Sequence, residues 1–326
     1  MKVAILGASI SAQTTNHITG EVTGYSEALH RDYSDPLNIT AFRRLSYSGN
    51  RVSDGGMIRA TELAAFAPDI RIFEPNVEDG SRGEDATRDE VLFVYDAIYR
   101  CGARPITLML PDDTLDPTTR PFYDFHRKIC TELQIPMIHV NLRGTDTTGL
   151  LYGVHTTPKG ALLYAELIAK GIKDIIGSSD FFTSPVPRLE PLTKVGRISA
   201  LIGDDVRLMR LRVTARDWSA AAKVRAVQYQ LIGQHSPVVQ IEVENTRTRK
   251  SVWDIFCHFE RLSFVTLFSM DFQRDSTVSL EIVDDDPNYE ACLRQGIVWP
   301  QPSERILKPR GDIFIISTHD VQAELL

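Results

Sequence analysis

Cysteine is scarce in this sequence, and its few copies stand far apart. The 326 residues include 4 cysteines, Cys101, Cys130, Cys257 and Cys292, without a C-x-x-C pair. This spacing excludes a zinc site built on paired cysteines and a dense disulfide framework. It favours a reduced compartment.

Long apolar runs are also missing. No window approaches the eighteen or more apolar residues that a membrane-spanning helix needs. The apolar run at the N-terminus, residues 3–6, is too short for the core of a signal peptide. We therefore expect a cytoplasmic protein that does not enter a membrane.

An excess of positive charge is absent as well. Lys and Arg total 36 against 43 Asp and Glu, a formal net charge of -7 at pH 7. Because the basic residues form no stripe that would neutralise a phosphate backbone, nucleic acids and anionic membranes are excluded as expected partners. What is present is the composition of an ordinary folded protein, 43% hydrophobic and 24% charged, in a chain long enough for two domains.

Short apolar runs alternate with amphipathic helical patterns up to residue 176. This alternation predicts a flavodoxin-like parallel sheet with helices on both faces, and it places any site in the loops at the carboxyl ends of the strands. The expected strands are residues 3–6, 38–47, 70–73, 105–110 and 136–140, and the expected helices are residues 25–33, 57–66, 84–100, 118–133 and 158–176.

The pattern changes in the second half of the chain. Residues 177–192 hold three prolines and three serines, a composition typical of a linker. Beyond them, alternation with period two predicts strands at 206–213, 226–232, 238–243, 252–259, 264–270, 277–283 and 313–317. We therefore expect an α/β domain over 1–176 and an all-β, sandwich-like domain over 193–326, which serves carbohydrate contact or oligomerisation.

Loops at the expected carboxyl edge hold residues suited to acyl transfer. Ser9 follows the first strand on a tight turn that would hold its hydroxyl over the sheet edge. Gly49, after the second strand, permits a backbone N–H to point at an oxyanion, and Gly55 and Gly56 are alternatives for this role. Asn76, after the third strand, offers a side-chain amide as a further donor.

His155 precedes the last helix of the α/β domain, within the sequence V-H-T-T-P-K-G. From there its imidazole would reach Ser9 and act as general base, then as acid toward the leaving group. This ordered set, with Gly49 and Asn76, resembles the SGNH (GDSL-like) hydrolase family over residues 1–176. The resemblance implies a five-stranded parallel sheet, Ser9 as nucleophile, His155 as base, and an oxyanion hole from the Ser9 N–H, the Gly49 N–H and Asn76.

Three positions depart from the family pattern. Ala8 replaces the aspartate of Gly-Asp-Ser, Glu74 replaces the glycine two residues before the asparagine, and Tyr152 replaces the aspartate three residues before the histidine. A carboxylate beside an oxyanion hole would repel the developing charge unless it points away or pairs with a cation. Arg51 and Arg143 are candidates for that cation.

The change at Tyr152 matters most, because the family's aspartate orients the imidazole and stabilises its cation. A neutral phenol supplies no negative charge. Candidate substitutes in neighbouring expected loops are Asp112, Asp113 and Asp146. A Ser-His dyad and a loss of catalysis are the other interpretations.

Each candidate also has a purely structural interpretation. Ser9 and Asn76 belong to residue types that form turns, and His155 also suits the start of a helix without any ligand. His139 is expected to be a core histidine at a strand end. Since the histidines show no H-x-x-x-H spacing, we expect neither a metal nor another cofactor.

The β domain carries weaker signals. Trp218, Tyr229, Trp253 and Trp299 suggest a sugar-stacking platform, but packing in the core or at an edge is the expected role of aromatics in a sandwich. The acidic run at 284–286 predicts a solvated turn, with a calcium site as the alternative.

Together these features predict a serine esterase, or acylhydrolase, that removes a small acyl group such as O-acetyl from a small-molecule or saccharide ester. The carbohydrate part follows from the family resemblance and the appended β domain alone. An O-acyltransferase that uses the same pocket and a non-catalytic binding module on the same fold are the alternatives.

Overall fold

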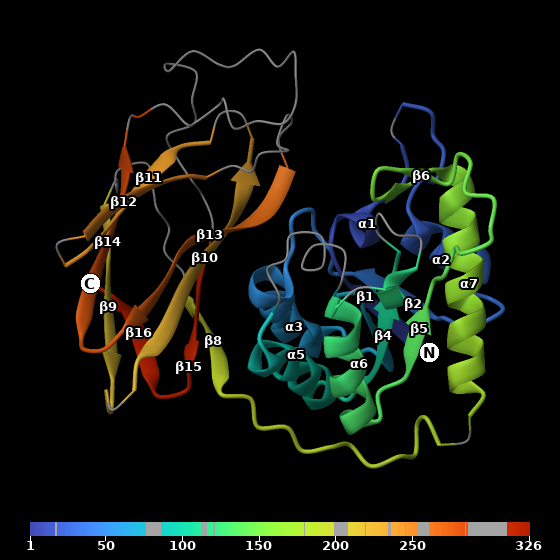
Figure 1. Ribbon diagram of the computed structural model, residues 1–326, viewed down its shortest axis with the longest axis horizontal. Helices are drawn as coiled ribbons and strands as arrows, with labels where there is room; N and C mark the ends of the chain where they lie inside the picture. The colour runs from blue at the N-terminus through green and yellow to red at the C-terminus, as the bar shows by residue number, and fades with distance from the viewer. Residues whose placement is uncertain are drawn as a thin grey trace. The chain divides into compact units, whose positions relative to one another are not determined.

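The computed structural model describes residues 1–16, 18–75, 86–111, 116–119, 121–178, 180–198, 208–218, 220–233, 236–244, 246–252, 261–283, 285 and 312–326. Several residues singled out above lie outside this set: Asn76, Asp112, Asp113, Trp253, Cys257, Asp284, Asp286, Cys292 and Trp299. The chain forms two compact units, residues 1–191 and 192–326 (Figure 1). Each unit is described by itself.

A five-stranded parallel sheet is the centre of the first unit. Its strand order, β2-β1-β3-β4-β5, is that of flavodoxin-like sheets and confirms the predicted fold class. In the middle of the sheet, Val3 pairs with Phe42 on one side and with Ile70 on the other. The strands are β1 Lys2–Leu6, β2 Ala41–Arg44, β3 Ile70–Phe73, β4 Arg104–Met109 and β5 Met137–His139.

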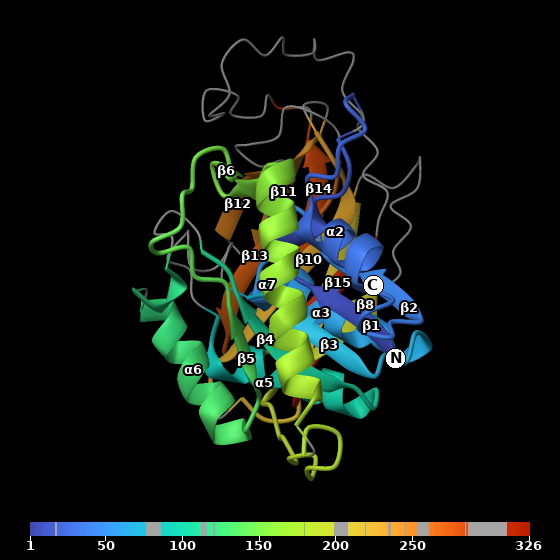
Figure 2. The ribbon, with the colours of Figure 1, turned by 90° about the vertical axis from the view of Figure 1, so that its right-hand side faces the viewer.

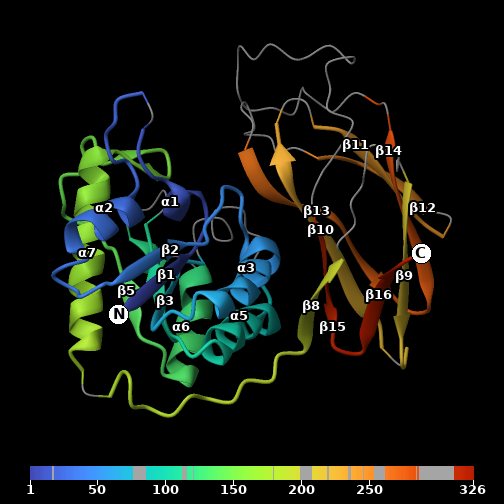
Figure 3. The ribbon, with the colours of Figure 1, turned by 180° about the vertical axis from the view of Figure 1, so that it is seen from behind.

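Helices cover both faces of this sheet. Helices α2 and α7 lie on one face and α3, α5 and α6 on the other (Figures 2 and 3). Alternate residues of the strands, such as Ile5, Ile72 and Ile106, bury their side chains under α2 and α7. The helices are α1 Ser9–Ala12, α2 Tyr25–Tyr33, α3 Met57–Thr61, α5 Arg88–Arg100, α6 Pro121–Leu133 and α7 Pro158–Ile176, with the shorter turns η1 Val52–Gly56, η2 Glu62–Ala65 and η3 Pro117–Thr119.

Capping residues explain where two of these helices begin. The Glu90 N–H donates to the Thr87 hydroxyl at 3.3 Å while the Glu90 carboxylate accepts the Thr87 N–H at 2.8 Å, a capping box that starts α5 at Arg88 rather than at the predicted residue 84. Thr157 caps α7 ahead of Pro158, and the bounds of α7 are those predicted.

Two predicted elements of the first unit are shorter than expected. The strand predicted at 38–47 is limited to Ala41–Arg44, because its only partner here, β1, offers five residues and because Asn38 has a left-handed φ of 53°. The helix predicted at 57–66 ends as α3 at Thr61 and tightens into the 3-10 turn η2 before Pro68. A positive φ at Ala67 ends this segment.

Residues 177–191, expected to be part of a linker, are held against the first unit. The Arg104 side chain donates to the carbonyl oxygens of Phe182, at 2.9 Å, and Ser184, at 2.6 Å. These bonds lie at the start of β4, the edge of the sheet opposite the carboxyl ends. No helix within the described part of the chain has both the length and the apolarity for crossing a membrane.

The second unit is a sandwich of two antiparallel sheets, which confirms the predicted all-β fold. The sheets have the orders β13-β10-β15-β8 and β12-β11-β14-β9-β16. Their facing side chains form one core, in which Val224 and Leu267 of the first sheet join Leu211 and Ile241 of the second. The strands are β8 Thr193–Ile198, β9 Leu208–Ala215, β10 Ala222–Ile232, β11 Val238–Val243, β12 Thr246–Ser251, β13 Arg261–Phe272, β14 Ser276–Val283, β15 Ile313–Thr318 and β16 Val321–Leu325.

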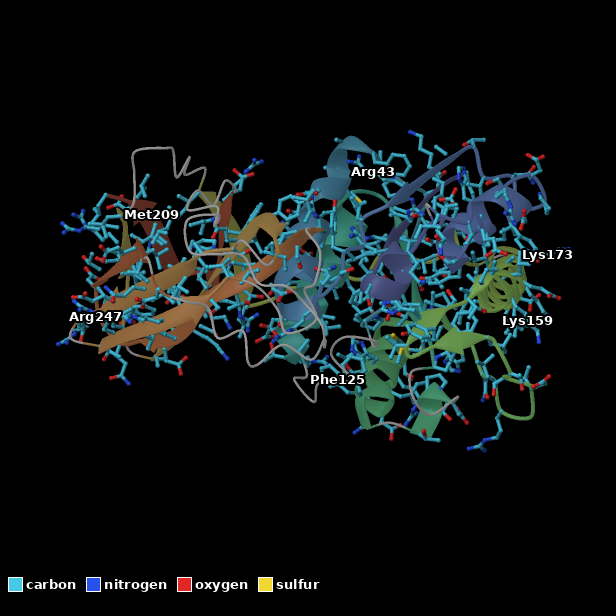
Figure 4. All side chains as sticks on the ribbon, turned by 90° about the horizontal axis from the view of Figure 1, so that it is seen from above. Arg43, Phe125, Lys159, Lys173, Met209 and Arg247 are labelled. Carbon is cyan, nitrogen blue, oxygen red and sulfur yellow. The ribbon has the colours of Figure 1, made fainter. Side chains whose placement is uncertain are left out.

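Three strands of the sandwich escaped prediction, β8, β12 and β16. Strand β12 reads Thr-Arg-Thr-Arg-Lys-Ser and has no apolar residue, because it is a solvated edge strand. Arg247, at the outer margin of the unit in Figure 4, pairs with Glu242 of β11 at 2.9 Å. Arg249 pairs with Asp285, the described residue of the acidic run.

The described aromatic candidates of the sandwich serve packing. Trp218 packs against the sandwich core, and its indole N–H donates to Asp275 at 2.7 Å. Tyr229 stacks on Phe264 across β10 and β13, with ring centroids 4.7 Å apart. Both contacts agree with packing as the expected role.

A buried histidine on α6 makes stability depend on pH. His126 is fully buried against Phe73, Phe122 and Phe125, and within the described residues neither of its ring nitrogens has a hydrogen-bond partner. Burial lowers the pKa of His126 from 6.5 to about 3. Between these values the unfolded chain binds the extra proton, so stability is lost as the pH falls below about 6.5.

Replacing His126 by leucine is expected to remove this dependence. At pH 5 the variant should gain about 2 kcal/mol over the wild type, beyond any difference at pH 8, since one unit of pKa corresponds to about 1.4 kcal/mol. Urea unfolding at the two pH values measures the gain. His30→Leu, at an exposed position of α2, is the control. An equal pH dependence in His126→Leu and the wild type would contradict the prediction.

Candidate active site

The loop after β1 places Ser9 at the carboxyl edge of the sheet. Ser9 is the first residue of α1, and its side chain is half-buried. The helix has no side-chain cap, and the Ser9 hydroxyl bonds to no other described residue. Within the described chain, Ser9 therefore does not act as a capping serine.

A buried carboxylate lies beneath this turn. Glu74, at the end of β3, is 2% exposed and accepts the Ala8 N–H at 3.0 Å and the Ser11 hydroxyl at 3.1 Å. The Ser11 oxygen is also 2.5 Å from the Tyr25 hydroxyl. Burial, reinforced by the charge of Glu74, raises the pKa of Tyr25 well above its usual value, so the phenol stays neutral. Glu74 thus binds the residues on both sides of Ser9.

Gly7 leaves the space that this arrangement needs. A Cβ at Gly7 would lie 2.5 Å from the Ser11 Oγ and 2.7 Å from a Glu74 carboxylate oxygen. A side chain here would therefore displace Glu74 from the turn. Arg143, one candidate partner for Glu74, pairs instead with Asp116 at 3.3 Å.

The loop after β2 is tied to the same turn. The Asn50 side-chain amide donates to the Gly7 carbonyl at 3.2 Å, and the preceding residue, Gly49, has a φ of 71° that favours glycine. In the described chain the Gly49 N–H has no backbone partner. The Gly55 N–H bonds to Asp54 at 2.5 Å and the Gly56 N–H to the Arg51 carbonyl at 2.8 Å. Gly49 is therefore the better candidate donor to an oxyanion.

His155 lies in a hairpin that the sequence did not predict. Strands β6, Leu151–Tyr152, and β7, His155–Thr156, are two residues long, too short to show a periodicity. Tyr152 pairs with His155 across the hairpin. The Tyr152 side chain is 75% exposed, whereas His155 is half-buried.

The Gln13 side chain joins the Ser9 helix to the His155 strand. The Gln13 oxygen accepts the Thr156 N–H at 3.0 Å, and its amide nitrogen donates to the Thr156 carbonyl at 3.2 Å. The Gln13 backbone N–H in turn donates to the Ser9 carbonyl at 3.1 Å. One residue thus connects the candidate nucleophile with the strand of the candidate base, although no sequence motif marked it.

The glycine of the V-H-x-x-P-x-G motif has a packing role. A Cβ at Gly160 would lie 2.0 Å from the Leu150 carbonyl oxygen, which also accepts the Thr157 N–H at 2.9 Å. The first turn of α7 therefore packs directly on the residue before β6. This contact fixes where the hairpin with His155 begins.

Of the three candidate acids, only Asp146 is a described residue. It lies on an exposed loop, and its carboxylate accepts the Thr148 N–H at 3.0 Å. Hydrogen bonds from Thr148 lower the pKa of Asp146.

His139 was expected to lie in the core, but it is exposed. Strand β5 ends at this residue, at the margin of the sheet, and the His139 ring contacts Tyr123.

Comparisons with known proteins agree on the fold. No protein-family model and no curated protein sequence matches this chain significantly. A two-domain esterase (CEX) active on acetylated mannans is similar, with a TM-score of 0.62 and 15% identity over 99% of this chain and 92% of that one. Its structure with mannopentaose gives 0.59 and 15%, over 98% and 90%.

A lipase/acylhydrolase from Enterococcus faecalis matches 53% of this chain and 96% of its own, with a TM-score of 0.42 and 19% identity. The comparison with the mannan esterase, over nearly the whole of both chains, shows that this chain has the same two-domain fold. The resemblance of the first unit to the SGNH (GDSL-like) hydrolases is confirmed in its fold.

Proposed function

We propose that this protein is a serine ester hydrolase that removes a small acyl group, such as O-acetyl, from a saccharide. The observation that carries the proposal is the connection of two elements at one sheet edge. Helix α1 begins with Ser9, and its last turn is bonded through Gln13 to the strand of His155. The saccharide part rests on the fold shared with an esterase active on acetylated mannans.

In the proposed reaction the Ser9 Oγ attacks the acyl carbon while His155 takes its proton. The negative charge that develops on the carbonyl oxygen is held by the Ser9 N–H, the Gly49 N–H and the Asn76 amide. His155 then gives the proton to the departing alcohol oxygen. Water then attacks the acyl carbon of the acyl-enzyme while His155 takes a proton from it. His155 returns this proton to the Ser9 oxygen, and the carboxylic acid is released.

Glu74 acts on this site through the turn after β1. One of its carboxylate oxygens accepts the Ala8 N–H and the Ser11 hydroxyl. These two bonds hold the turn that presents Ser9. Asp112, Asp113 and Asp146 stay candidates for the group that orients the His155 imidazole. Gln13 positions His155 indirectly, through its bonds to the backbone of the next residue, Thr156.

Covalent labelling tests the proposal. A fluorophosphonate is expected to modify the folded protein once, at Ser9, because only an activated serine reacts with it. Intact mass and peptide mapping identify the site. Ser9→Ala should stay unlabelled, whereas Ser178→Ala, at an exposed serine near the opposite edge of the sheet, should label like the wild type.

Two other outcomes would point to the alternatives. A folded protein that takes up no label would be a non-catalytic binding module. A protein that takes up the label and, in a separate assay without the label, transfers the acetyl group to an added saccharide and releases acetate only when no saccharide is present would be an acyltransferase.

A further inference from the structure

The hairpin that carries His155 has two unlike faces. Leu151 and Thr156 are opposite each other, and both are turned toward the core: Thr156 is 3% exposed and Leu151 packs against the hydrophobic core of the first unit. Tyr152 and His155 form the other pair and so share the other face. Directly opposite residues of an antiparallel pair have their Cβ atoms about 4.5 to 5.5 Å apart. The Tyr152 and His155 side chains therefore leave the hairpin side by side on this face.

The tight turn of the hairpin holds this pair in place. Gly153, with a φ of 62°, is the first of the two turn residues, where primed hairpin turns need a positive φ. Gln13 holds the far end of the hairpin through both backbone groups of Thr156. Within this anchored hairpin, Tyr152 is 75% exposed, so its ring is available to a ligand.

The chemistry of ester cleavage decides which part of a substrate meets this ring. His155 must give its proton to the leaving alcohol oxygen, so the alcohol lies on the His155 side of the acyl carbon. An alcohol larger than a few atoms then extends over the residues beside His155. We propose that Tyr152 is a saccharide-stacking residue, whose ring packs against the apolar C–H face of the pyranose that carries the ester. This inference rests on the proposed function.

An aromatic ring suits this task because one of its faces can be apolar contact area while its hydroxyl stays in water. Stacking on a sugar also differs from the role of the aspartate that the hydrolase family has at this position. A carboxylate here would act on the imidazole and affect every substrate alike. A stacking ring acts on the alcohol and affects only substrates whose alcohol is a sugar.

Kinetics on two esters test the inference. For an acetylated manno-oligosaccharide, Tyr152→Ala is expected to raise KM about tenfold, which corresponds to the loss of about 1.4 kcal/mol of contact. For ethyl acetate, whose alcohol has two carbons, kcat/KM should stay within twofold. Tyr152→Phe and Tyr152→Trp keep a ring and should retain the wild-type KM. Phe182→Ala, an exposed aromatic of the segment bonded to the start of β4, is the matched control.

Equal losses on both esters would overturn the inference, because they would place the effect on His155 rather than on the sugar. An unchanged KM for the oligosaccharide in Tyr152→Ala would overturn it as well. So would a tenfold rise in Tyr152→Phe, since the hydroxyl and not the ring would then be the binding group.

Binding of mannopentaose, which carries no ester, separates this inference from the proposed function. Titration calorimetry should show weaker binding to Tyr152→Ala than to the wild type and little change for Tyr152→Trp. A protein that hydrolyses neither ester but shows this difference would contradict the proposed function and support the stacking site. Equal binding to wild type and Tyr152→Ala, or no binding to either, would overturn the stacking site.

Discussion

Ser9→Ala is expected to lower kcat/KM for ester hydrolysis by about 10⁴-fold or more, and adding His155→Ala to it should lower the rate hardly further. A nucleophile and its base act in one step, so the loss of either removes the whole covalent route. What is left is the slower reaction of water in a site that still binds the ester and stabilises its oxyanion.

Steady-state kinetics of the two single variants and the double variant measure the loss in kcat/KM of each. Multiplied losses in the double variant, about 10⁸-fold, would show that Ser9 and His155 act in separate steps and would contradict the proposed mechanism. Full activity in His155→Ala would show that another group takes the Ser9 proton. His30→Ala, on the exposed side of α2, should keep wild-type rates.

The parts of the fold that could be predicted are those determined by local sequence. Strand β3, with Ile70, Ile72 and Phe73, lies in the middle of a parallel sheet and is buried on both faces, and the start of α7 follows from Thr157 and Pro158. Strand β12 could not be predicted, because its polar residues pair only through the neighbouring strand β11. That partner is local, since Val243 pairs with Thr246 in a hairpin, but without apolar residues β12 shows no period of two in the sequence.

The same distinction holds for the site. Ser9 and His155 could be proposed because each stands beside the end of an element that the sequence itself marks. The contacts that hold them could not, because they join distant parts of the chain: Gln13 and Thr156 are 143 residues apart, and Ala8 and Glu74 are 66 apart. The sequence left open whether Glu74 would repel the oxyanion, point away or pair with a cation, and only the folded chain shows that it binds the turn through Ala8 and Ser11.

Gln13→Ala is expected to lower kcat about 10- to 100-fold with little change in KM. Gln13 makes two bonds to the Thr156 backbone, and its own N–H bonds to the Ser9 carbonyl. Without the side chain, β7 is free to move relative to α1, and a displacement of about 1 Å between reacting groups can cost about 10²-fold. The polar atoms of the Gln13 side chain are bonded to Thr156, so KM should be spared.

A graded series shows whether Gln13 acts through position. Gln13→Glu keeps an acceptor for the Thr156 N–H but loses the donor to the Thr156 carbonyl, so its kcat should lie between those of Gln13→Ala and the wild type. The rate of fluorophosphonate labelling should fall in the same order, because labelling needs the base beside Ser9 but no saccharide. Gln322→Ala, at an exposed position of β16, is the control.

Thermal unfolding of the same variants separates this effect from a general loss of structure. Removal of the three hydrogen bonds between the Gln13 side chain and Thr156 is expected to lower the free energy of unfolding by about 1.5 to 4.5 kcal/mol, which leaves the first unit folded at assay temperature. A lower kcat in a variant that is still fully folded then reports the position of His155 relative to Ser9. A Gln13→Ala variant that is folded and labels as fast as the wild type would refute this role, because the two elements would then keep their distance without the Gln13 bonds.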